Sequence, residues 1–434
     1  MPEPLLSPHR PVPSGSLAIA AFSTIVEWYD FTLYLYFATV LSRVMFGGGE
    51  AGLLTTLASF ALAYLLRPLG ALFFGHIGDR HGRRRSLLLS VALMTAAMLA
   101  MALLPTHAEV GGLAGVLMML LRCVMGFAVG GEYTGVVAYL LEGAPAHRRG
   151  LITSLAAAAS EVGGLLAVFL SALIVSLVPP GALEQWGWRI PFLFGALLAA
   201  GVWALRTTVA ESPEYERQQA AGTVPSEPLR HALTHHRAGI LRGFAISALG
   251  SITYYVGISY VPAFLTSVGS RSETTSLWWS TGAAVAVILV TPLVGLAADR
   301  WGRKPPLLLL CLGSALLPAT MFWLMAGGSP ALALGGTLVL ACLAGGVSAV
   351  GAVATAEQFA GEARLTGLAL GATVATAIFG GLTPYVAQRL SSGTGWPSAP
   401  GLMIAVVALA VLPVLWRLPE TKPALGPEPR SPDN

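Results

Sequence analysis

Long apolar runs separated by short polar loops constrain this chain more than any other feature. A helix needs about 20 mostly apolar residues to cross a bilayer, where each backbone N–H and C=O must be bonded within its own segment. The runs lie near residues 17–40, 51–74, 86–104, 112–142, 151–177, 189–207, 239–267, 277–298, 306–325, 331–357, 366–391 and 400–418. We therefore expect an all-α membrane protein with twelve transmembrane helices.

Composition supports the membrane assignment. Of 434 residues, 55% are hydrophobic and only 11% are charged, whereas soluble domains carry about 25% charged residues. The pI of about 9.1 could indicate a nucleic-acid partner, but such a partner needs a continuous basic face. Most arginines lie instead in short loops, so we expect no nucleic-acid binding.

The loop charges predict the orientation. With the N-terminus inside, the external side keeps only Arg43, Arg189, Arg271 and Arg389, and most other basic residues are cytoplasmic. This bias follows the positive-inside rule and predicts a multi-pass protein of a bacterial-type inner membrane with both termini cytoplasmic. The first 15 residues are polar and rich in proline and lack a signal-peptide pattern, so we expect a cytoplasmic tail.

The longest polar break divides the chain into halves. We expect an N-terminal tail over 1–16, a six-helix bundle over 17–207, a cytoplasmic linker over 208–238, a second six-helix bundle over 239–418 and a C-terminal tail over 419–434. His231, His235 and His236 in the linker lack nearby carboxylate or cysteine partners, which favours a solvated linker over a metal site. We expect no metal and no cofactor.

An internal repeat relates the two halves. GHIGDRHGRRR (75–85) and GLAADRWGRK (295–304) both fit G-x-x-x-D-R-x-G-R-(R/K). Gly78, Gly82 and Gly302 are expected to permit tight turns. Asp79 and Asp299 are expected to pair with arginines of neighbouring helix ends and so to hold the cytoplasmic face shut. A purely topological role for these two residues is disfavoured, because acidic residues contribute little to membrane topology.

The doubled loop motif resembles the signature of the major facilitator superfamily. EWYDF (27–31), RPLG (67–70), RCVMGFAVGGEYTG (122–135), GWRIPF (187–192) and ATAIFGGLTP (375–384) resemble its metabolite–proton symporters, the carriers of proline/betaine, 2-oxoglutarate, citrate and shikimate. The resemblance implies two pseudo-symmetric bundles around a cavity, alternating access, and carboxylates of the cytoplasmic charge network at Glu142 and Glu357. The expected cytoplasmic gate comprises Gly75, Gly78, Asp79, Arg80, Gly82, Arg83, Glu142, Arg148, Asp299, Arg300, Gly302, Arg303, Glu357 and Arg364.

Ionisable residues at bilayer depth are costly and indicate function. Glu27 and Asp30 share one helix face and lie at a depth similar to that of Arg122 in an antiparallel helix. A buried carboxylate can either pair with an arginine while ionised or bind a proton and lose that pairing, so proton binding is coupled to the charge of the pair. We predict that Glu27, Asp30 and Arg122 couple protons; a purely structural ion pair is the alternative.

Six residues are candidates for the substrate cavity. Arg67 could reach the substrate path or snorkel to the interface. Glu132 follows a glycine-rich run typical of close helix packing, and Glu161 could merely bond a neighbouring helix. Tyr254 and Tyr255 point to different helix faces, so only one is expected to face the path. The predicted cavity residues are Arg67, Arg122, Glu132, Glu161, Tyr254 and Tyr255.

These observations predict a proton-coupled importer of a small organic acid or zwitterion. We expect it to be a monomer whose partners are the substrate, protons and membrane lipid. The sequence has no Walker loop, nucleophile elbow or zinc motif, so we expect no enzyme. One alternative is a proton-driven exporter, although SEVGGLLAVFL (160–170) lacks the proline of the exporters' fifth-helix motif. The other is a sensor that does not transport.

Overall fold

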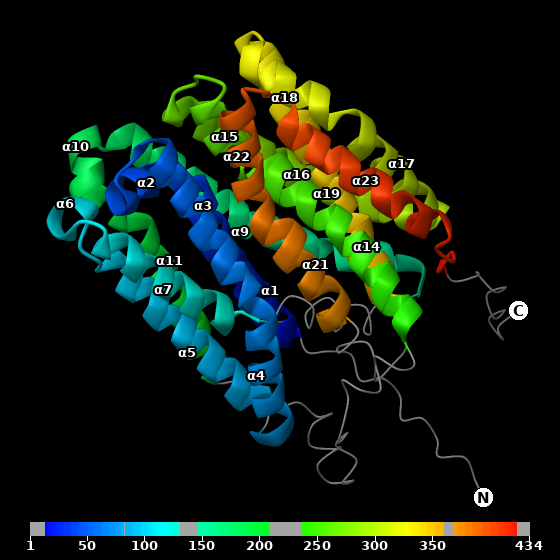
Figure 1. The fold of residues 1–434 in the computed structure, drawn as a ribbon. Coiled ribbons are helices and arrows are strands. Elements are labelled where there is room, and N and C mark those ends of the chain that lie inside the picture. Colours follow the sequence, from blue (N-terminus) through cyan, green and yellow to red (C-terminus); the bar gives the residue numbers. More distant parts are fainter. Residues whose placement is uncertain (1–13, 82, 131–145, 208–235, 360–367, 423–434) are drawn as a thin grey trace, which may run out of the picture.

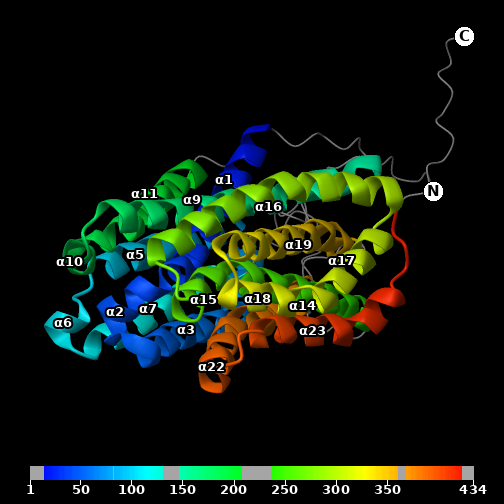
Figure 2. The ribbon, with the colours of Figure 1, turned by 90° about the horizontal axis from the view of Figure 1, so that it is seen from above.

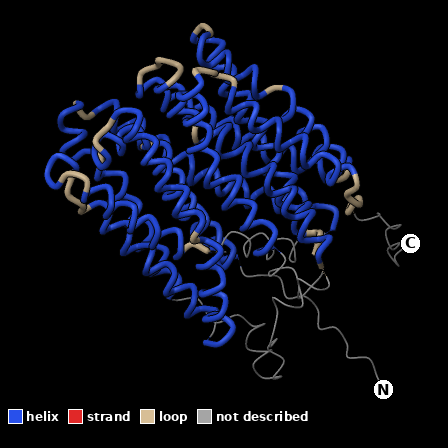
Figure 3. Tube along the Cα trace, viewed as in Figure 1, coloured by secondary structure: helices blue, strands red, loops and turns tan. Residues whose placement is uncertain are grey.

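The computed structural model describes residues 14–81, 83–130, 146–207, 236–359 and 368–422. Within these ranges the chain is almost entirely helical and contains no strand (Figure 3). Helices are what a lipid environment requires, because they bond their own backbone groups. The expected all-α class is confirmed.

The first half contains both long helices and short helical turns. They are α1 (Ser14–Tyr36), α2 (Ala38–Phe46), α3 (Gly49–Leu65), α4 (Arg67–His81), α5 (Arg83–Ala102), α6 (His107–Val110), α7 (Leu113–Ala128), the 3-10 turn η1 (Ala146–Arg148), α9 (Arg149–Leu177), α10 (Pro180–Ala182), the π-helix η2 (Leu183–Gly187) and α11 (Arg189–Thr207).

The second half contains three π-helical segments inside its helices. Its elements are α14 (Arg237–Tyr254), π-helix η3 (Tyr255–Ser259), α15 (Val261–Ser267), α16 (Glu273–Trp301), α17 (Lys304–Leu316), α18 (Pro318–Gly327), α19 (Pro330–Ala356), π-helix η5 (Ala369–Thr373), α21 (Val374–Thr376), π-helix η6 (Ala377–Leu382), α22 (Thr383–Thr394) and α23 (Ala399–Trp416). Each of the twelve predicted apolar segments overlaps at least one of the helices of the two halves.

Seven helices of the described chain are long and apolar enough to cross a membrane, or nine if each bent pair is one span. One bent pair is α17 and α18, which meet at 44° before Pro318, where a proline removes a helical hydrogen bond. Two shorter apolar helices cover Leu88–Ala102 and Leu113–Ala128. Length and composition therefore do not by themselves resolve the predicted count of twelve.

Large apolar side chains cover the outside of the helix array. Leu177, Leu309 and Leu316 are each at least 70% exposed, and many other leucines and tryptophans are exposed as well. Such a surface is unusual for a monomer in water. It suits helices whose outer faces contact lipid.

The two halves lie side by side, with the first half (blue to green, ending with α11) next to the second (bright green to red, beginning with α14) (Figures 1 and 2). Their most extensive contact joins α9 and α16, and a second contact joins α3 and η6. Close approach in the first contact requires glycine: a Cβ at Gly295 would lie 2.3 Å from Ser154 Oγ, and one at Gly150 would lie 2.7 Å from the Gly295 carbonyl oxygen.

The helices that carry the two copies of the repeated motif end at equivalent residues, α4 at His81 and α16 at Trp301. Gly302 follows α16 with φ of 97°, a region that favours glycine, so the expected turn is confirmed there. Gly78 lies inside α4, which continues to His81, so the expectation of a tight turn at Gly78 is wrong. Gly82 lies outside the described residues.

Candidate functional site

A buried ion pair joins α1 to α7. Arg122 Nη1 donates to Asp30 Oδ2 at 3.0 Å, and both side chains are 0% exposed. Equal depth on antiparallel helices was the basis for expecting either Glu27 or Asp30 to pair with Arg122, and the structure forms the pair with Asp30. Nε and Nη2 of Arg122 have no hydrogen-bond partner among the described residues, so this guanidinium has donors for another anion.

Glu27, one helical turn before Asp30, pairs with a different arginine. Arg67 Nη2 donates to Glu27 Oε1 at 2.6 Å. Arg67 begins α4 just after the break at Leu66, and it is only 9% exposed. It therefore points into the protein and does not snorkel to the interface. The site contains two acid–arginine pairs rather than one shared arginine.

Aromatic rings separate both pairs from solvent. The Phe31 ring centroid lies 4.3 Å from Arg67 Cζ and 5.6 Å from Arg122 Cζ. Tyr64 covers Arg67 at 4.9 Å and Tyr34 covers Arg122 at 4.4 Å. A desolvated cation over an aromatic face gains about 2 kcal/mol, so these rings hold the guanidinium groups in place.

The paired acids are linked to the second half through tyrosines. The hydroxyls of Tyr64 on α3 and Tyr255 on η3 hydrogen-bond to each other. Tyr254 contacts the edge of Trp28 on α1 at 5.3 Å. We expected only one of the adjacent tyrosines to face the path, but both are buried where the halves meet, against different helices of the first half.

Glycines in η6 explain why the GGLTP sequence lies at this point. A Cβ at Gly380 would lie 2.7 Å from the Tyr255 ring, and one at Gly381 would lie 2.4 Å from Tyr64 Cβ. Larger residues would separate the two tyrosine rings. π-helical segments such as η3 and η6 often occur at functional sites.

Glu161 is buried near the middle of α9 and lies within electrostatic reach of the Tyr254 hydroxyl. Tyr36 on α1 is a further ionisable neighbour of Glu161. The predicted cavity residues Glu161, Tyr254 and Tyr255 thus lie together at the contact between the halves. Glu132 lies outside the described residues.

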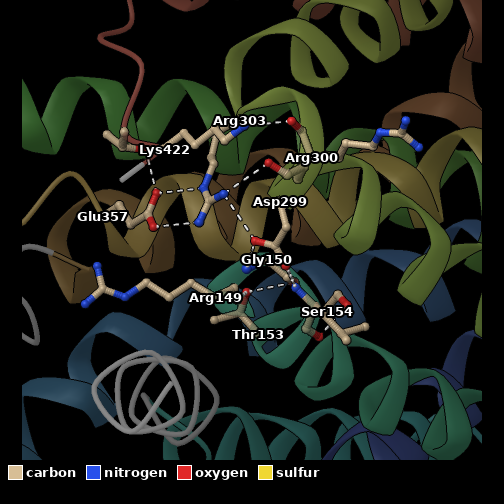
Figure 4. A network of polar contacts seen from close by, with 12 residues as sticks. Arg149, Gly150, Thr153, Ser154, Asp299, Arg300, Arg303, Glu357 and Lys422 are labelled. Atoms are coloured by element: carbon tan, nitrogen blue, oxygen red, sulfur yellow. Dashed lines mark hydrogen bonds and ion pairs between the residues drawn. The ribbon is translucent and has the colours of Figure 1, made fainter. Parts of the chain in front are cut away.

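A polar network crosses between the halves at the ends of α9 and α16 (Figure 4). The Asp299 carboxylate accepts hydrogen bonds from the backbone N–H groups of Gly150 at 2.7 Å and Leu151 at 2.8 Å. It also pairs with Arg303 at 3.2 Å. The expected partner was an arginine of a neighbouring helix end. Arg303 is the N-cap of α17, so this pairing is present. The N-terminus of α9, whose dipole favours a negative charge, is an additional partner from the other half.

Arg303 connects this network to α19 and to the end of the chain. It donates from Nε and Nη2 to both Glu357 oxygens at 3.1 Å and is 1% exposed. Thr421 also donates to Glu357, and Lys422 Nζ donates to the Arg300 carbonyl oxygen at 2.7 Å. Asp299, Arg300, Gly302, Arg303 and Glu357, all predicted for the gate, therefore lie together.

Glu420 closes the same network. Its carboxylate accepts from the backbone N–H groups of Arg303 at 2.9 Å and Lys304 at 3.1 Å. Partial burial raises the pKa of Glu420, but hydrogen bonds from these groups and from Lys422 outweigh burial and hold the pKa below its ordinary value. Glu420 was not among the gate residues predicted from the sequence.

The other predicted gate residues have less structural support. For five of them the structure describes only the helical backbone, which belongs to α4 for Gly75, Gly78, Asp79 and Arg80 and to the start of α5 for Arg83. Arg148 is exposed in η1, before α9. Gly82, Glu142 and Arg364 lie outside the described residues.

The sequence analysis missed an ion-pair cluster at the opposite end of α16. Arg43 on α2 donates to both Glu273 oxygens at 3.0 Å and to Glu184 Oε1 at 2.8 Å. Nearby, Trp278 Nε1 donates to Ser176 Oγ at 3.0 Å. Arg43 is one of four basic residues expected on the external side, and this rarity was the only available signal.

An array of lipid-facing helices in two halves, with buried ion pairs at its centre and charge clusters across both ends, is the architecture of a membrane transporter. Residues 17–223 match the family described as "Sugar (and other) transporter", and residues 270–433 match "Major Facilitator Superfamily". The chain belongs to the major facilitator superfamily. It is a secondary transporter and not an enzyme.

The similar proteins are bacterial carriers. The chain is 32% identical to the alpha-ketoglutarate permease of Escherichia coli (strain K12), over 86% of each chain. It is 32% identical to the shikimate transporter of the same strain, over 94% of each chain. A glycine betaine/proline/ectoine/pipecolic acid transporter of Dickeya dadantii is 29% identical over 96% of this chain and 86% of its own. The expected resemblance to metabolite–proton symporters is confirmed.

A solved structure supports the fold. The xylose transporter XylE from E. coli, in a partially occluded inward-open conformation, superposes with a TM-score of 0.75 over 95% of this chain and 99% of its own. At 22% sequence identity, this similarity shows the fold alone.

Proposed function

We propose that this carrier imports a small organic acid or zwitterion together with protons, in a bacterial-type inner membrane with both termini cytoplasmic. The buried Asp30–Arg122 pair is the observation that carries the proposal. The names of relatives support it: one is a citrate–proton symporter, and others are named for proline and betaine, alpha-ketoglutarate or shikimate. The proposed partners are the substrate, protons and lipid, and the proposed working unit is a monomer.

The pair explains how a proton and an anion would bind together. While Asp30 is ionised, it neutralises Arg122. Protonation of Asp30 would remove that negative charge and leave the buried guanidinium without a counterion, which is strongly unfavourable. An anionic substrate would restore the balance through Nε and Nη2 of Arg122, which have no hydrogen-bond partner among the described residues. Proton binding would therefore favour anion binding.

Glu27 and Arg67 provide a second pair within the same aromatic cluster. Arg67 stacks on both Phe31 and Tyr64, and Tyr64 hydrogen-bonds to Tyr255 in the second half. Protonation of Glu27 would therefore alter the contact between the halves through Arg67 and Tyr64. Glu27 and Asp30 are the proposed proton-binding residues, and Arg122 is the proposed substrate-binding base.

Alternating access requires contacts at each end that open in turn. The proposed cytoplasmic gate is the Asp299 contact with α9, and the proposed external gate is the Arg43–Glu273 pair. Both are formed in this structure, which is the arrangement expected of an occluded carrier. The proposed halves cover 17–207 and 239–418, joined by the linker 208–238.

Uptake into proteoliposomes tests the proposal. Vesicles with an alkaline interior would be offered labelled proline, glycine betaine, 2-oxoglutarate, citrate and shikimate. We expect accumulation of at least one ligand above its external concentration, and loss of that accumulation when a protonophore collapses the gradient. Accumulation only under the reversed gradient would indicate an exporter, and equilibration unaffected by either gradient would contradict proton coupling.

A further inference from the structure

Glu161 differs from the other acids buried at the centre of the carrier. Glu27 and Asp30 each have an arginine, whereas none of the described basic side chains pairs with Glu161, which is 3% exposed. An ionised carboxylate buried without a cation costs several kcal/mol. The proposed transport mechanism uses Asp30 and Glu27 and leaves Glu161 unexplained.

The surroundings of Glu161 come from both halves. The Tyr254 hydroxyl approaches from α14 and Tyr36 from α1. A Cβ at Gly164, one turn along α9, would lie 3.4 Å from Tyr254 Oη, which is an ordinary van der Waals distance, so the Tyr254 hydroxyl lies directly against α9 beside the acid. Tyr254 also has Trp28 and Tyr255 at ring-centroid distances of 5.3 Å.

A carboxylate beside several aromatic rings is the arrangement that recognises a cationic nitrogen. The carboxylate forms the strong charge-assisted contact, and tyrosine and tryptophan rings attract an ammonium group through their electron-rich faces. An anion would instead meet the charge of Glu161 and the same ring faces unfavourably. The chemistry of this position is thus opposite to that of Arg122.

We propose that Glu161 and Tyr254 form a subsite for the ammonium group of the substrate. The inference rests on the proposed transport function, because Arg122 would bind the carboxylate of the same molecule. It narrows the substrate class from organic acids in general to zwitterions. Glu161 selects for the cation, and Tyr254 brings the second half of the carrier to the bound ligand.

Two ligands of matched shape test this subsite. Proline and cyclopentanecarboxylate share a five-membered ring and a carboxylate, but only proline carries the ammonium nitrogen. Their binding would be measured on the purified full-length carrier without a proton gradient. A hydrogen bond to a charged group contributes about 1.5–3 kcal/mol, so wild-type carrier should bind proline about tenfold to a hundredfold more tightly than cyclopentanecarboxylate.

Glu161→Gln should reduce that preference to about threefold or less while leaving cyclopentanecarboxylate binding within about threefold of wild type. Ser160→Ala is the matched control, because among the described residues the Ser160 hydroxyl bonds only to the Ala156 carbonyl oxygen of its own helix, and it should keep the full preference. Tyr254→Phe, which retains the ring, should reduce the preference for proline by about threefold to tenfold. This variant tests the subsite independently if Glu161→Gln does not fold.

Equal losses for both ligands in Glu161→Gln, or an unchanged preference, would overturn the subsite. So would a wild-type carrier that binds cyclopentanecarboxylate as tightly as proline, or that binds neither. None of these results bears on proton-driven uptake of another ligand in proteoliposomes, so the subsite can fail while the proposed transport function stands.

Discussion

Asp299→Asn should destabilise the cytoplasmic-closed state of the carrier. The carboxylate accepts two short hydrogen bonds from the α9 N-terminus, at 2.7 and 2.8 Å, and it pairs with Arg303. An asparagine keeps one acceptor, turns its NH2 group toward a backbone donor, and removes the charge that the helix dipole favours. Loss of a helix N-cap contact costs about 0.5–2 kcal/mol, and the dipole interaction adds up to about 2 kcal/mol.

A total of about 2 kcal/mol would shift the equilibrium between closed and open cytoplasmic states by about 30-fold. The assay is the distance distribution between spin labels at His147 and Trp301, which are exposed near the two sides of the contact, in a background with Cys123, Cys311 and Cys342 replaced. The wild type should show mainly the short distance, and Asp299→Asn should add a long-distance population.

Thr153→Val is the matched control, since the Thr153 hydroxyl donates only within α9, to the Arg149 and Gly150 carbonyl oxygens. Its distance distribution should match wild type. If Asp299→Asn also matched wild type, the contact would not hold the cytoplasmic face closed, and the reasoning on the helix terminus would be refuted.

Three other changes have expected outcomes. Arg43→Gln should increase external labelling of a cysteine placed near Glu273 by at most about fivefold, because exposed ion pairs contribute about 0.2–1 kcal/mol. An unchanged labelling rate would contradict the proposal that this ion pair is the external gate. Asp79→Asn should slow transport strongly and change substrate binding by less than about tenfold, whereas loss of binding would place Asp79 in the substrate site or in folding. The pKa of Glu420 is lowered in the folded protein, so its stabilising hydrogen bonds are present near neutral pH and are lost as pH falls through that pKa. Glu420→Gln should therefore abolish the part of the fall in melting temperature at acid pH that this residue causes. An unchanged dependence of the melting temperature on pH would contradict its role.

A pair between Arg122 and an acid of α1 could be predicted from the sequence because helix geometry determines the depth of these residues, but Glu27 and Asp30 were both candidates for it. Asp30 and Arg122 could be placed at one depth by counting residues from the ends of antiparallel helices, and the structure pairs them at 3.0 Å. Arg67 could not be assigned in this way. Its direction depends on the break at Leu66 between α3 and α4, and a Leu–Arg–Pro sequence does not define the direction in which the chain leaves such a break.

Contacts between loops were also beyond sequence reasoning. Arg43 meets Glu184 and Glu273, which are 141 and 230 residues away along the chain, and no periodic pattern links such positions. The repeated motif shows a further limit. Gly302 follows α16 with a positive φ, whereas Gly78, at the motif position that Ala298 occupies in the second copy, lies inside α4. A glycine in this motif therefore does not by itself mark a turn, because both helices continue through that position to His81 and Trp301.

Proton-driven accumulation by Asp30→Asn tests the central claim most directly. The variant removes the titratable carboxylate beside Arg122 and should abolish accumulation driven by a pH gradient while preserving counterflow exchange of the same substrate; Glu27→Gln should behave alike. The measurement compares labelled uptake into proteoliposomes with and without the gradient, alongside counterflow at equal pH. The account predicts loss of gradient-driven accumulation with exchange near the wild-type rate, and wild-type accumulation by both variants would contradict it.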